Sequence, residues 1–226
     1  MCGRFSQNLG RHQRAIIFFR NRADLALPAR YNIAPTQYVP VFRQEIAGSE
    51  PEVRDLYWGL VPSWAKRMAM GSMSINARCE TLAEKTTFRE AFKKRRCIVP
   101  ASGFYEWKVG PDKKTRIPYY FTSANEDDGL GLAGLWERWD KHGEEILSFS
   151  IITTEANALV SDVHHRMPVI LPPESWAAWL DPGNTDRGGL SDLMQPAADG
   201  VLQYWQVSQY VNNPRNEGEE CIRRVS

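Results

Sequence analysis

The sequence predicts a single strand-rich α/β domain with few helices, and three observations support this fold class. The chain has 226 residues, 42% of them hydrophobic and 24% charged, which is enough to bury the core of one domain. Strand candidates recur through the chain and are separated by turns such as Gly-Pro-Asp and Lys-His-Gly. We find no repeat, low-complexity linker or clear domain boundary, so we expect residues 1–226 to form one domain.

The expected elements follow in chain order. Apolar and basic residues at roughly helical spacing predict an amphipathic helix over 8–21, and residues 31–36 are typical of a loop ended by proline. We expect short helices at 87–94 and 173–180, the second with a proline in its first turn. The predicted strands are 39–43, 52–58, 97–100, 104–109, 118–122, 131–139, 147–153 and 203–208.

Charge and cysteine usage exclude several classes of protein. The net charge of +1 does not indicate a strongly basic nucleic-acid protein, so any such binding depends on a local patch. No segment approaches the roughly 18 apolar residues of a membrane span, and the charged start lacks the apolar region of a secretory signal. The cysteines show no C-x-x-C spacing, which argues against a zinc site or a disulfide scaffold. We therefore expect a protein of the reducing cytoplasm without metal or cofactor.

Cys2 is the first candidate for chemistry. A small second residue normally permits removal of the initiator Met, which leaves Cys2 with an amine and a thiol on adjacent carbons. Their reference pKa values are about 7.7–8.0 and about 8.5, so part of each is nucleophilic at neutral pH. The amine can condense with an aldehyde, and the thiol can then close onto the imine carbon to form a thiazolidine. Position alone favours the alternative that Cys2 is an incidental residue of a loose terminus.

Two further residues are candidates for proton transfer. Glu106 lies among aromatic residues in a strand candidate, where burial would raise its pKa; the alternative is a solvent-facing strand residue. His164 precedes an apolar run, and histidine suits proton shuttling near neutral pH. The doublet with His165 leaves the choice between the two open, and a structural or exposed histidine is the commoner case.

Candidate binding residues lie in two stretches. Asn76 and Arg78 would face the same side of an extended segment, where an amide can hold an oxygen or an amine and a guanidinium can hold a phosphate. Trp58 and Trp64 flank an irregular stretch, and loop aromatics beside basic residues can stack on unpaired bases. For Trp58 we favour a core position. The basic run 93–96 is better explained as a solvated face at a helix end.

Six motifs occur together and in order, and with them the chain resembles the SRAP family, the SOS-response-associated peptidase domain of bacteria and of eukaryotic abasic-site sensors. The resemblance covers residues 2 to about 218. The motifs are Met1-Cys2-Gly3-Arg4-Phe5, Tyr31-Asn32-Ile33-Ala34-Pro35-Thr36, Trp58-Gly59-Leu60-Val61-Pro62, Asn76-Ala77-Arg78-Cys79-Glu80-Thr81, Gly103-Phe104-Tyr105-Glu106-Trp107 and His164-His165-Arg166-Met167-Pro168.

The resemblance implies a compact α/β domain with a central β-barrel-like core and a positively charged groove for a single strand. It implies that Cys2 forms a thiazolidine with the ring-opened sugar of an abasic site. Asn76 would orient the Cys2 amine or the sugar, and Glu106 would assist imine formation and proton transfer. His164 would be the acid–base residue for ring closure and its reversal.

The resemblance also implies a set of DNA-binding residues. Arg4 and Arg78 would hold phosphates beside the abasic site. The other expected contacts of the strand are Asn32, Pro35, Pro40, Trp64 and Thr153. Some family members carry an Arg just before the Phe of the following helix, where this chain has Thr86-Thr87-Phe88. We expect Lys85 or Arg89 to replace that phosphate contact.

The expected partner is therefore single-stranded DNA with abasic sites, bound by a monomer in the cytoplasm, at the nucleoid during damage if the source is bacterial. Two alternatives stay open. One is a cysteine peptidase that removes its own Met1. Lyase activity at the abasic site is a separate activity that the resemblance also leaves open. The other is a noncovalent reader of single-stranded nucleic acid that uses Trp64 and the arginines and is indifferent to the abasic site.

Overall fold

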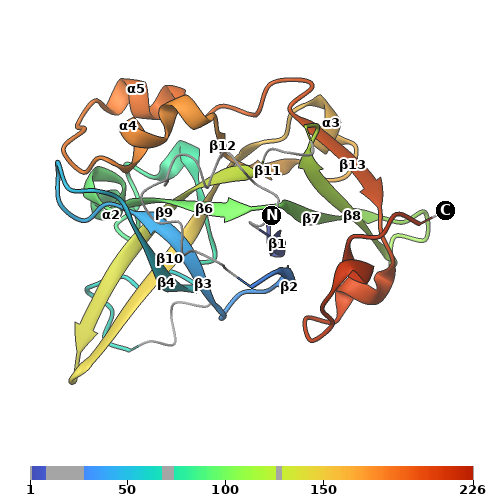
Figure 1. Cartoon of the computed structure of the whole chain (residues 1–226), viewed down its shortest axis with the longest axis horizontal. Helices are drawn as coiled ribbons and strands as arrows, with labels where there is room; N and C mark the ends of the chain where they lie inside the picture. The colour runs from blue at the N-terminus through green and yellow to red at the C-terminus, as the bar shows by residue number, and fades with distance from the viewer. Residues whose placement is uncertain (1, 9–27, 68–73, 126–128, 226) are drawn as a thin grey trace.

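The computed structural model of the chain describes residues 2–8, 28–67, 74–125 and 129–225. Two β-sheets form its body, and short helices lie at their margins (Figure 1). This mixed architecture confirms the strand-rich, helix-poor fold that the sequence predicts. Among the described residues, no helix has the length and apolar run that crossing a bilayer requires.

A five-stranded antiparallel sheet carries the start of the chain. Its strand order is β13-β8-β7-β1-β2. The strands are β1 (Phe5–Gln7), β2 (Arg30–Ile33), β7 (Gly103–Val109), β8 (Arg116–Ser123) and β13 (Leu202–Gln206). Because β1 pairs with β7, the first residues of the chain lie beside the middle of a strand that is a hundred residues away in sequence.

An eight-stranded sheet forms the larger layer. Its members are β3 (Tyr38–Arg43), β4 (Glu52–Trp58), β5 (Asn76–Arg78), β6 (Arg96–Ala101), β9 (Leu130–Lys141), β10 (Glu144–Glu155), β11 (Arg166–Pro168) and β12 (Ile170–Leu171). β10 pairs with β4 and also with β9, so the path β4-β3-β6-β9 returns to β10. This gives the expected barrel-like core, although the sheet is not a simple closed barrel because β5, β11 and β12 extend beyond that path.

The helices are short and several begin at side-chain caps. They are α2 (Arg89–Lys94), α3 (Ala158–Ser161), α4 (Trp176–Leu180) and α5 (Arg187–Asp192), with 3-10 turns η3 (Cys79–Thr81), η4 (Pro173–Ser175), η5 (Gln209–Asn212) and η6 (Glu219–Cys221). The Asn157 side chain caps α3 by accepting from the Val160 backbone N–H at 3.0 Å. That cap fixes where the chain turns toward β11.

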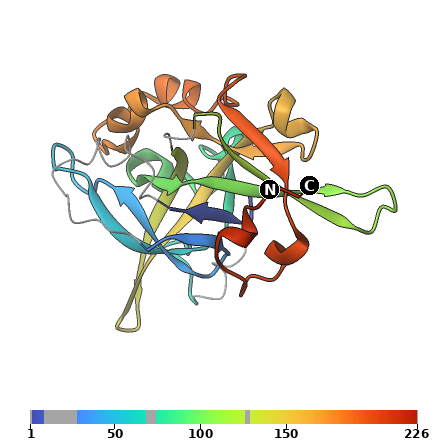
Figure 2. The same cartoon turned by 45° about the vertical axis from the view of Figure 1, so that its right-hand side comes forward.

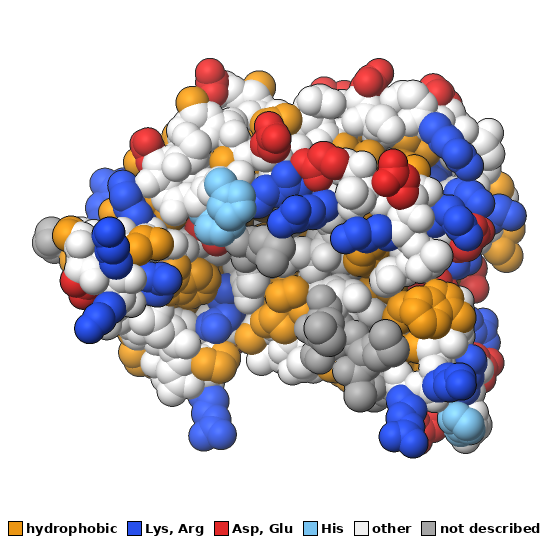
Figure 3. All heavy atoms as spheres, turned by 180° about the vertical axis from the view of Figure 1, so that it is seen from behind, with side chains coloured by type: hydrophobic (Ala, Val, Ile, Leu, Met, Phe, Trp, Pro, Cys, Tyr) orange, Lys and Arg blue, Asp and Glu red, His pale blue; other side chains and the backbone are white. Residues whose placement is uncertain are grey.

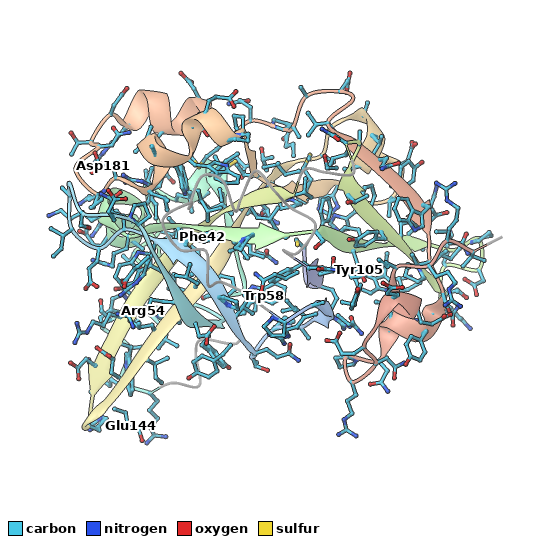
Figure 4. The ribbon with its side chains drawn as sticks, viewed as in Figure 1. Phe42, Arg54, Trp58, Tyr105, Glu144 and Asp181 are labelled. Carbon is cyan, nitrogen blue, oxygen red and sulfur yellow. The ribbon has the colours of Figure 1, made fainter. Side chains whose placement is uncertain are left out.

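The two sheets meet at a buried aromatic cluster. Phe5 of β1 packs edge-on against Trp58 of β4 with ring centroids 5.0 Å apart, and Trp58 stacks on Phe149 of β10 at 6.1 Å. Trp58 is completely buried, which confirms the core position favoured for it (Figure 4). Burial of each such side chain contributes about 1.5–3 kcal/mol, so this cluster holds β1 firmly against the larger sheet.

The predicted strands are all present with small shifts at their ends, whereas three local predictions need comment. The predicted loop 31–36 is wrong in its first half, because residues 31–33 belong to β2. The predicted helix 173–180 begins as the 3-10 turn η4 before α4. Almost all of the predicted helix 8–21 lies outside the described residues. The sequence pattern of apolar and turn residues did not predict β1 and β5, each of which is only three residues long.

Candidate active site at the start of the chain

Strand pairing places Cys2 close to Glu106. Phe5 lies opposite Phe104, and the Tyr105 backbone N–H donates to the Arg4 carbonyl oxygen at 3.0 Å. Continuing this antiparallel register places Gly3 opposite Glu106 and Cys2 one residue beyond, and the charge of Glu106 acts on the Cys2 thiol. Cys2 is fully buried, and both burial and the charge of Glu106 raise the pKa of its thiol. The thiol is therefore held in its neutral form in this state of the chain.

Glu106 faces the interior. Alternate residues of a strand face the same side, so Glu106 shares a side with Phe104, which is completely buried. Glu106 itself is 3% exposed, and burial raises its pKa to about 7. Of the two alternatives left open by the sequence, the structure supports the buried carboxyl. Such a group can both release and take up a proton near neutral pH.

Asn76 joins the larger sheet to the start of the chain. It lies on β5, opposite Ile151 of the parallel neighbour β10. Its Nδ2 donates a hydrogen bond to the Cys2 carbonyl oxygen at 2.9 Å. Its Oδ1 is buried and has no hydrogen-bond partner among the residues that the structure describes. An acceptor buried in this way has a free-energy cost unless a donor reaches it, so Oδ1 is suited to accept from a substrate hydroxyl or an amine.

His164 follows α3 directly and is the half-buried member of the histidine doublet. Its Nδ1 lies 3.0 Å from the Arg166 backbone nitrogen and 3.2 Å from the Arg166 carbonyl oxygen, so it accepts from the first or donates to the second according to the ring's tautomer. Burial lowers the pKa of His164, so the neutral ring is favoured. His165 is exposed and stacks on it at 4.4 Å between ring centroids. The residues around His164, namely Val160, Val163 and Met167, belong to the same core cluster as Cys2.

An ion pair that sequence reasoning missed connects the Asn76 and His164 segments. The Arg166 guanidinium donates to Glu80 through Nη1 at 2.5 Å and Nη2 at 3.0 Å, and Nη2 also donates to the Thr153 carbonyl oxygen at 2.7 Å. The bond to Arg166 lowers the pKa of Glu80. Glu80 lies in the same sequence motif as Asn76, and Arg166 lies in the same motif as His164. This shared membership was the sequence feature that could have indicated the ion pair.

Three of the expected DNA contacts lie at the surface. Trp64 is 51% exposed, in the turn after β4, and its carbonyl oxygen accepts from Lys141 Nζ at 3.4 Å. Arg78 is exposed at the end of β5, and Pro35 is half-buried before β3. Lys and Arg side chains gather in a band across the face shown in Figure 3, with a histidine side chain in that band. Lys85 and Arg89, the expected replacements for the family Arg, are both exposed.

The other expected contacts are held inside the protein. Asn32 and Thr153 are completely buried, and Pro40 is buried in β3. The Asn32 Nδ2 donates to three carbonyl oxygens of the C-terminal segment, those of Val211, Asn213 and Asn216. Because they are buried, Asn32, Pro40 and Thr153 do not offer their side chains to a DNA strand bound at the surface.

Arg4 points away from Glu106. It lies opposite Tyr105 and so shares the other side of the sheet. Its Nη1 donates to the Asn32 Oδ1 at 2.7 Å and to the Val211 carbonyl oxygen at 2.9 Å, and the guanidinium lies 5.8 Å from the centre of a Trp107 ring. In this arrangement Arg4 fastens the start of the chain to the C-terminal segment. Tyr105, on the same side, is labelled in Figure 4.

No group of three or more His, Cys, Asp or Glu side chains suited to a metal ion occurs among the described residues. The four cysteines are free thiols. What the arrangement provides is a buried thiol, a carboxyl titrating near neutrality, an amide and a neutral imidazole around one end of the chain. Groups of these types can serve covalent and proton-transfer chemistry.

Comparison with known proteins gives a consistent result. The family model described as SOS response associated peptidase (SRAP) matches residues 1–214. The abasic site processing protein YoqW of Bacillus subtilis is 42% identical over 193 residues, which cover 85% of this chain and 84% of YoqW. The abasic site processing protein HMCES of Pongo abelii is 31% identical over 272 residues, with 100% of this chain and 76% of HMCES covered.

Solved structures agree on the fold. A crystal structure of a protein from Bacteroides thetaiotaomicron superposes with a TM-score of 0.83 at 28% identity and covers 100% of both chains. A crystal structure of a protein from Bordetella bronchiseptica gives a TM-score of 0.76 at 28% identity and covers 92% of this chain and 100% of the other.

Proposed function

Because this chain belongs to the SRAP family, we propose that it processes abasic sites in DNA and that it does so through a covalent bond from Cys2. An abasic site in its ring-opened form presents an aldehyde. Cys2 has the two nucleophiles that trap an aldehyde in a ring, provided that Met1 has been removed. While Met1 is attached, the Cys2 nitrogen is an amide and this chemistry is closed.

The proposed reaction has two bond-forming steps. The Cys2 amine adds to the aldehyde carbon, and loss of one water gives an imine. The Cys2 sulfur then adds to the imine carbon while the nitrogen takes up a proton, which closes a five-membered thiazolidine. Because both nucleophiles belong to one residue, the second step is intramolecular, and this lowers the barrier by several kcal/mol, at most about 7–11 in well-oriented cases.

Each polar neighbour has a part in this scheme. Glu106, with a pKa of about 7, takes a proton from the Cys2 ammonium and returns one to the opened sugar oxygen or to the leaving water. Asn76 keeps the Cys2 backbone in place through its Nδ2, and its Oδ1 accepts from the amine or from a sugar hydroxyl. His164, whose neutral form is favoured by burial, assists thiol deprotonation at ring closure and reprotonation on reversal.

The hydrogen bond from Asn76 to the Cys2 carbonyl oxygen is the observation that carries the proposal. Chain ends are commonly loose, whereas this end is fully buried and held by a side chain 74 residues away. Burying a carboxyl beside a thiol does not stabilise the fold, because the carboxylate makes the charged form of the thiol less favourable. A site for covalent chemistry explains the arrangement.

We propose that the strand is single at the abasic site. The exposed Trp64 offers a ring for stacking on an unpaired base, and the exposed Arg78 offers a guanidinium for a neighbouring phosphate. A base held in a duplex has both faces covered and could not stack on Trp64. Stacking of this kind contributes about 1–3 kcal/mol per base.

A denaturing gel tests the function. Protein lacking Met1 is incubated with a single-stranded oligonucleotide that carries one abasic site, and we expect a shifted band that survives denaturation. Cys2→Ala should abolish the band. Cys97→Ala is the matched control, because Cys97 is also completely buried but lies on β6. No band with the wild type, or an unchanged band with Cys2→Ala, would refute the proposal, and salt-sensitive binding to intact strands alone would favour a noncovalent reader.

A second candidate is removal of Met1 by the protein itself. The proximity of Glu106 to Cys2 favours it, since the same carboxyl can assist attack on the preceding peptide bond. Glu106→Gln made in cells where the wild type loses Met1 should then retain Met1, as intact-mass measurement would show. Loss of Met1 from Glu106→Gln at the wild-type level would assign the step to a separate aminopeptidase. Strand cleavage at the abasic site would appear on the same gels as a shortened oligonucleotide.

A further inference from the structure

The hairpin formed by β7 and β8 ends in four exposed cations. They are Lys108, Lys113, Lys114 and Arg116, which we call the basic hairpin tip. Figure 2 shows this hairpin projecting from the body of the molecule. The four cations lie within nine residues of a chain whose net charge is only +1.

No ion pair neutralises the basic hairpin tip within the part of the chain that the structure describes. Elsewhere, cations such as Arg43, Arg95 and Arg138 each pair with a glutamate. The one acid of the turn, Asp112, is used by the backbone, because its Oδ1 accepts from the N–H groups of Lys114 at 2.9 Å and of Thr115 at 2.8 Å. The Thr115 hydroxyl also donates to the Asp112 Oδ2, and this bond first, then the two backbone bonds, holds the pKa of Asp112 below its usual value.

The turn is braced, so it presents its charges in a fixed place. The Gly110 backbone N–H donates to the Thr115 carbonyl oxygen at 3.0 Å, and the Lys113 N–H donates to the Gly110 carbonyl oxygen at 2.9 Å. Lys113 has a positive φ of 59°, a conformation that lysine rarely adopts. A strained, charged and internally fixed turn at the surface is well suited to holding a partner.

The basic hairpin tip continues directly from the proposed active site. Lys108 lies two residues beyond Glu106 on β7 and shares its side of the sheet, about 7 Å along the strand. Tyr119, the residue opposite Glu106 on β8, lies on that same side and contacts Tyr204 with ring centroids 5.7 Å apart. On the face shown in Figure 3, Lys and Arg side chains gather at the left edge, over the end of this hairpin.

We propose that the basic hairpin tip binds the sugar-phosphate backbone of the DNA strand on one flank of the abasic site, with Tyr119 beneath the first base of that flank. The proposal rests on the function proposed above. The residues from Lys108 to the turn reach about 7–20 Å from Glu106 at 3.3 Å per residue, a span of several phosphates. Nucleic acid is the partner that fits, because an unpaired cluster of cations beside an aromatic ring matches a charged backbone with bases.

Salt dependence tests the proposal independently of the chemistry. The hairpin variant combines Lys108→Gln, Lys113→Asn and Lys114→Gln; Asn is chosen at position 113 because it tolerates the left-handed conformation. The matched control removes three cations at a distance, with Lys93→Gln, Lys94→Gln and Arg187→Gln. All are compared in a Cys2→Ala background by anisotropy with a 25-nucleotide single strand over a series of KCl concentrations. Adduct formation with a five-nucleotide abasic strand is measured in parallel with Cys2 intact.

We expect the hairpin variant to lower the slope of log Kd against log salt by about 2, since each phosphate contact on a single strand contributes about 0.7. The control variant should keep the wild-type slope. Both variants should still form the adduct with the short strand, which shows that they fold. An unchanged slope in the hairpin variant, or an equal fall in the control, would overturn the inference. Failure of wild type to form any adduct would instead refute the proposed function.

Discussion

Asn76 and Cys2 are joined by a hydrogen bond of 2.9 Å between the Asn76 Nδ2 and the Cys2 carbonyl oxygen. This bond links β5 of the eight-stranded sheet to the segment that leads into β1 of the five-stranded sheet. It therefore sets the position of the proposed nucleophile relative to both sheets. The aromatic contact between Phe5 and Trp58 stabilises the same junction three residues further along the chain.

Asn76→Asp should slow adduct formation. The substitution keeps the size of the side chain but replaces the amide donor with a second oxygen, which would face the Cys2 carbonyl without a proton. Loss of a hydrogen bond with a buried acceptor left behind costs about 1–3 kcal/mol, which corresponds to a rate about 5- to 150-fold lower if the bond positions Cys2 in the reaction. Quenched time points on denaturing gels give the rate. An equal rate for Asn76→Asp would show that the bond is only structural.

Glu106→Gln should remove one pH-dependent part of the stability. Below pH 4.5 the carboxyl is protonated in folded and unfolded chains alike. Between there and the folded pKa of about 7 the unfolded chain ionises first, so the wild type loses stability as pH rises. The advantage of Glu106→Gln in unfolding free energy should grow by about 3 kcal/mol between pH 4.5 and pH 8. Urea titrations across this range measure it, and a constant difference would contradict the buried, raised-pKa carboxyl.

Glu106→Gln should also change the pH profile of adduct formation. Wild-type rates should show a limb with a midpoint near pH 7, where Glu106 titrates. The variant should react more slowly and lack that limb, because glutamine does not exchange protons. A limb that persists in Glu106→Gln would assign the titration to another group, such as the Cys2 amine.

Arg166→Lys should affect His164 without removing charge. Lysine cannot make the two-pronged contact with Glu80, so the segment that directs the Arg166 backbone N–H at His164 Nδ1 should loosen. We expect severalfold slower formation and reversal of the adduct in both Arg166→Lys and Glu80→Gln. The double variant should be no slower than the slower single variant. Additive losses would show that the two residues act separately.

Trp58→Ala should destabilise the junction between the sheets. Truncating a completely buried tryptophan costs about 3–5 kcal/mol of unfolding free energy. Trp58→Phe, the matched control, keeps a ring against Phe5 and should lose less. Urea unfolding measures both, and a loss below 1 kcal/mol for Trp58→Ala would contradict the packing described for this cluster.

Much of the fold was accessible from local pattern, because long strands such as β9 and β10 carry strong signals over many residues. β1 and β5 were not, since three residues are too few for periodicity to show. Their formation depends on partners distant in sequence, such as Phe104 for Phe5 and Ile151 for Asn76. The extent of the domain and the monomeric state remain predictions.

The residues of the candidate site could be predicted from the sequence, whereas their orientations and contacts could not. The orientation of Glu106 could not be derived, because aromatic residues on both sides of it leave no alternation to indicate which face is buried. Asn32 is interior because the C-terminal segment folds back over β2, and no local sequence pattern predicts this contact. The ion pair between Glu80 and Arg166 joins residues 86 apart, so only the shared motifs hinted at it.

Intact-mass spectrometry of the reaction mixture tests the central claim most directly. Protein and a single-stranded abasic oligonucleotide are combined without reductant and measured by mass, then mapped after digestion. We predict a species equal to the chain lacking Met1 plus the oligonucleotide minus one water, with the modification at Cys2 and its absence in Cys2→Ala. An adduct that retains Met1, or one that maps to a lysine, would contradict the thiazolidine at Cys2.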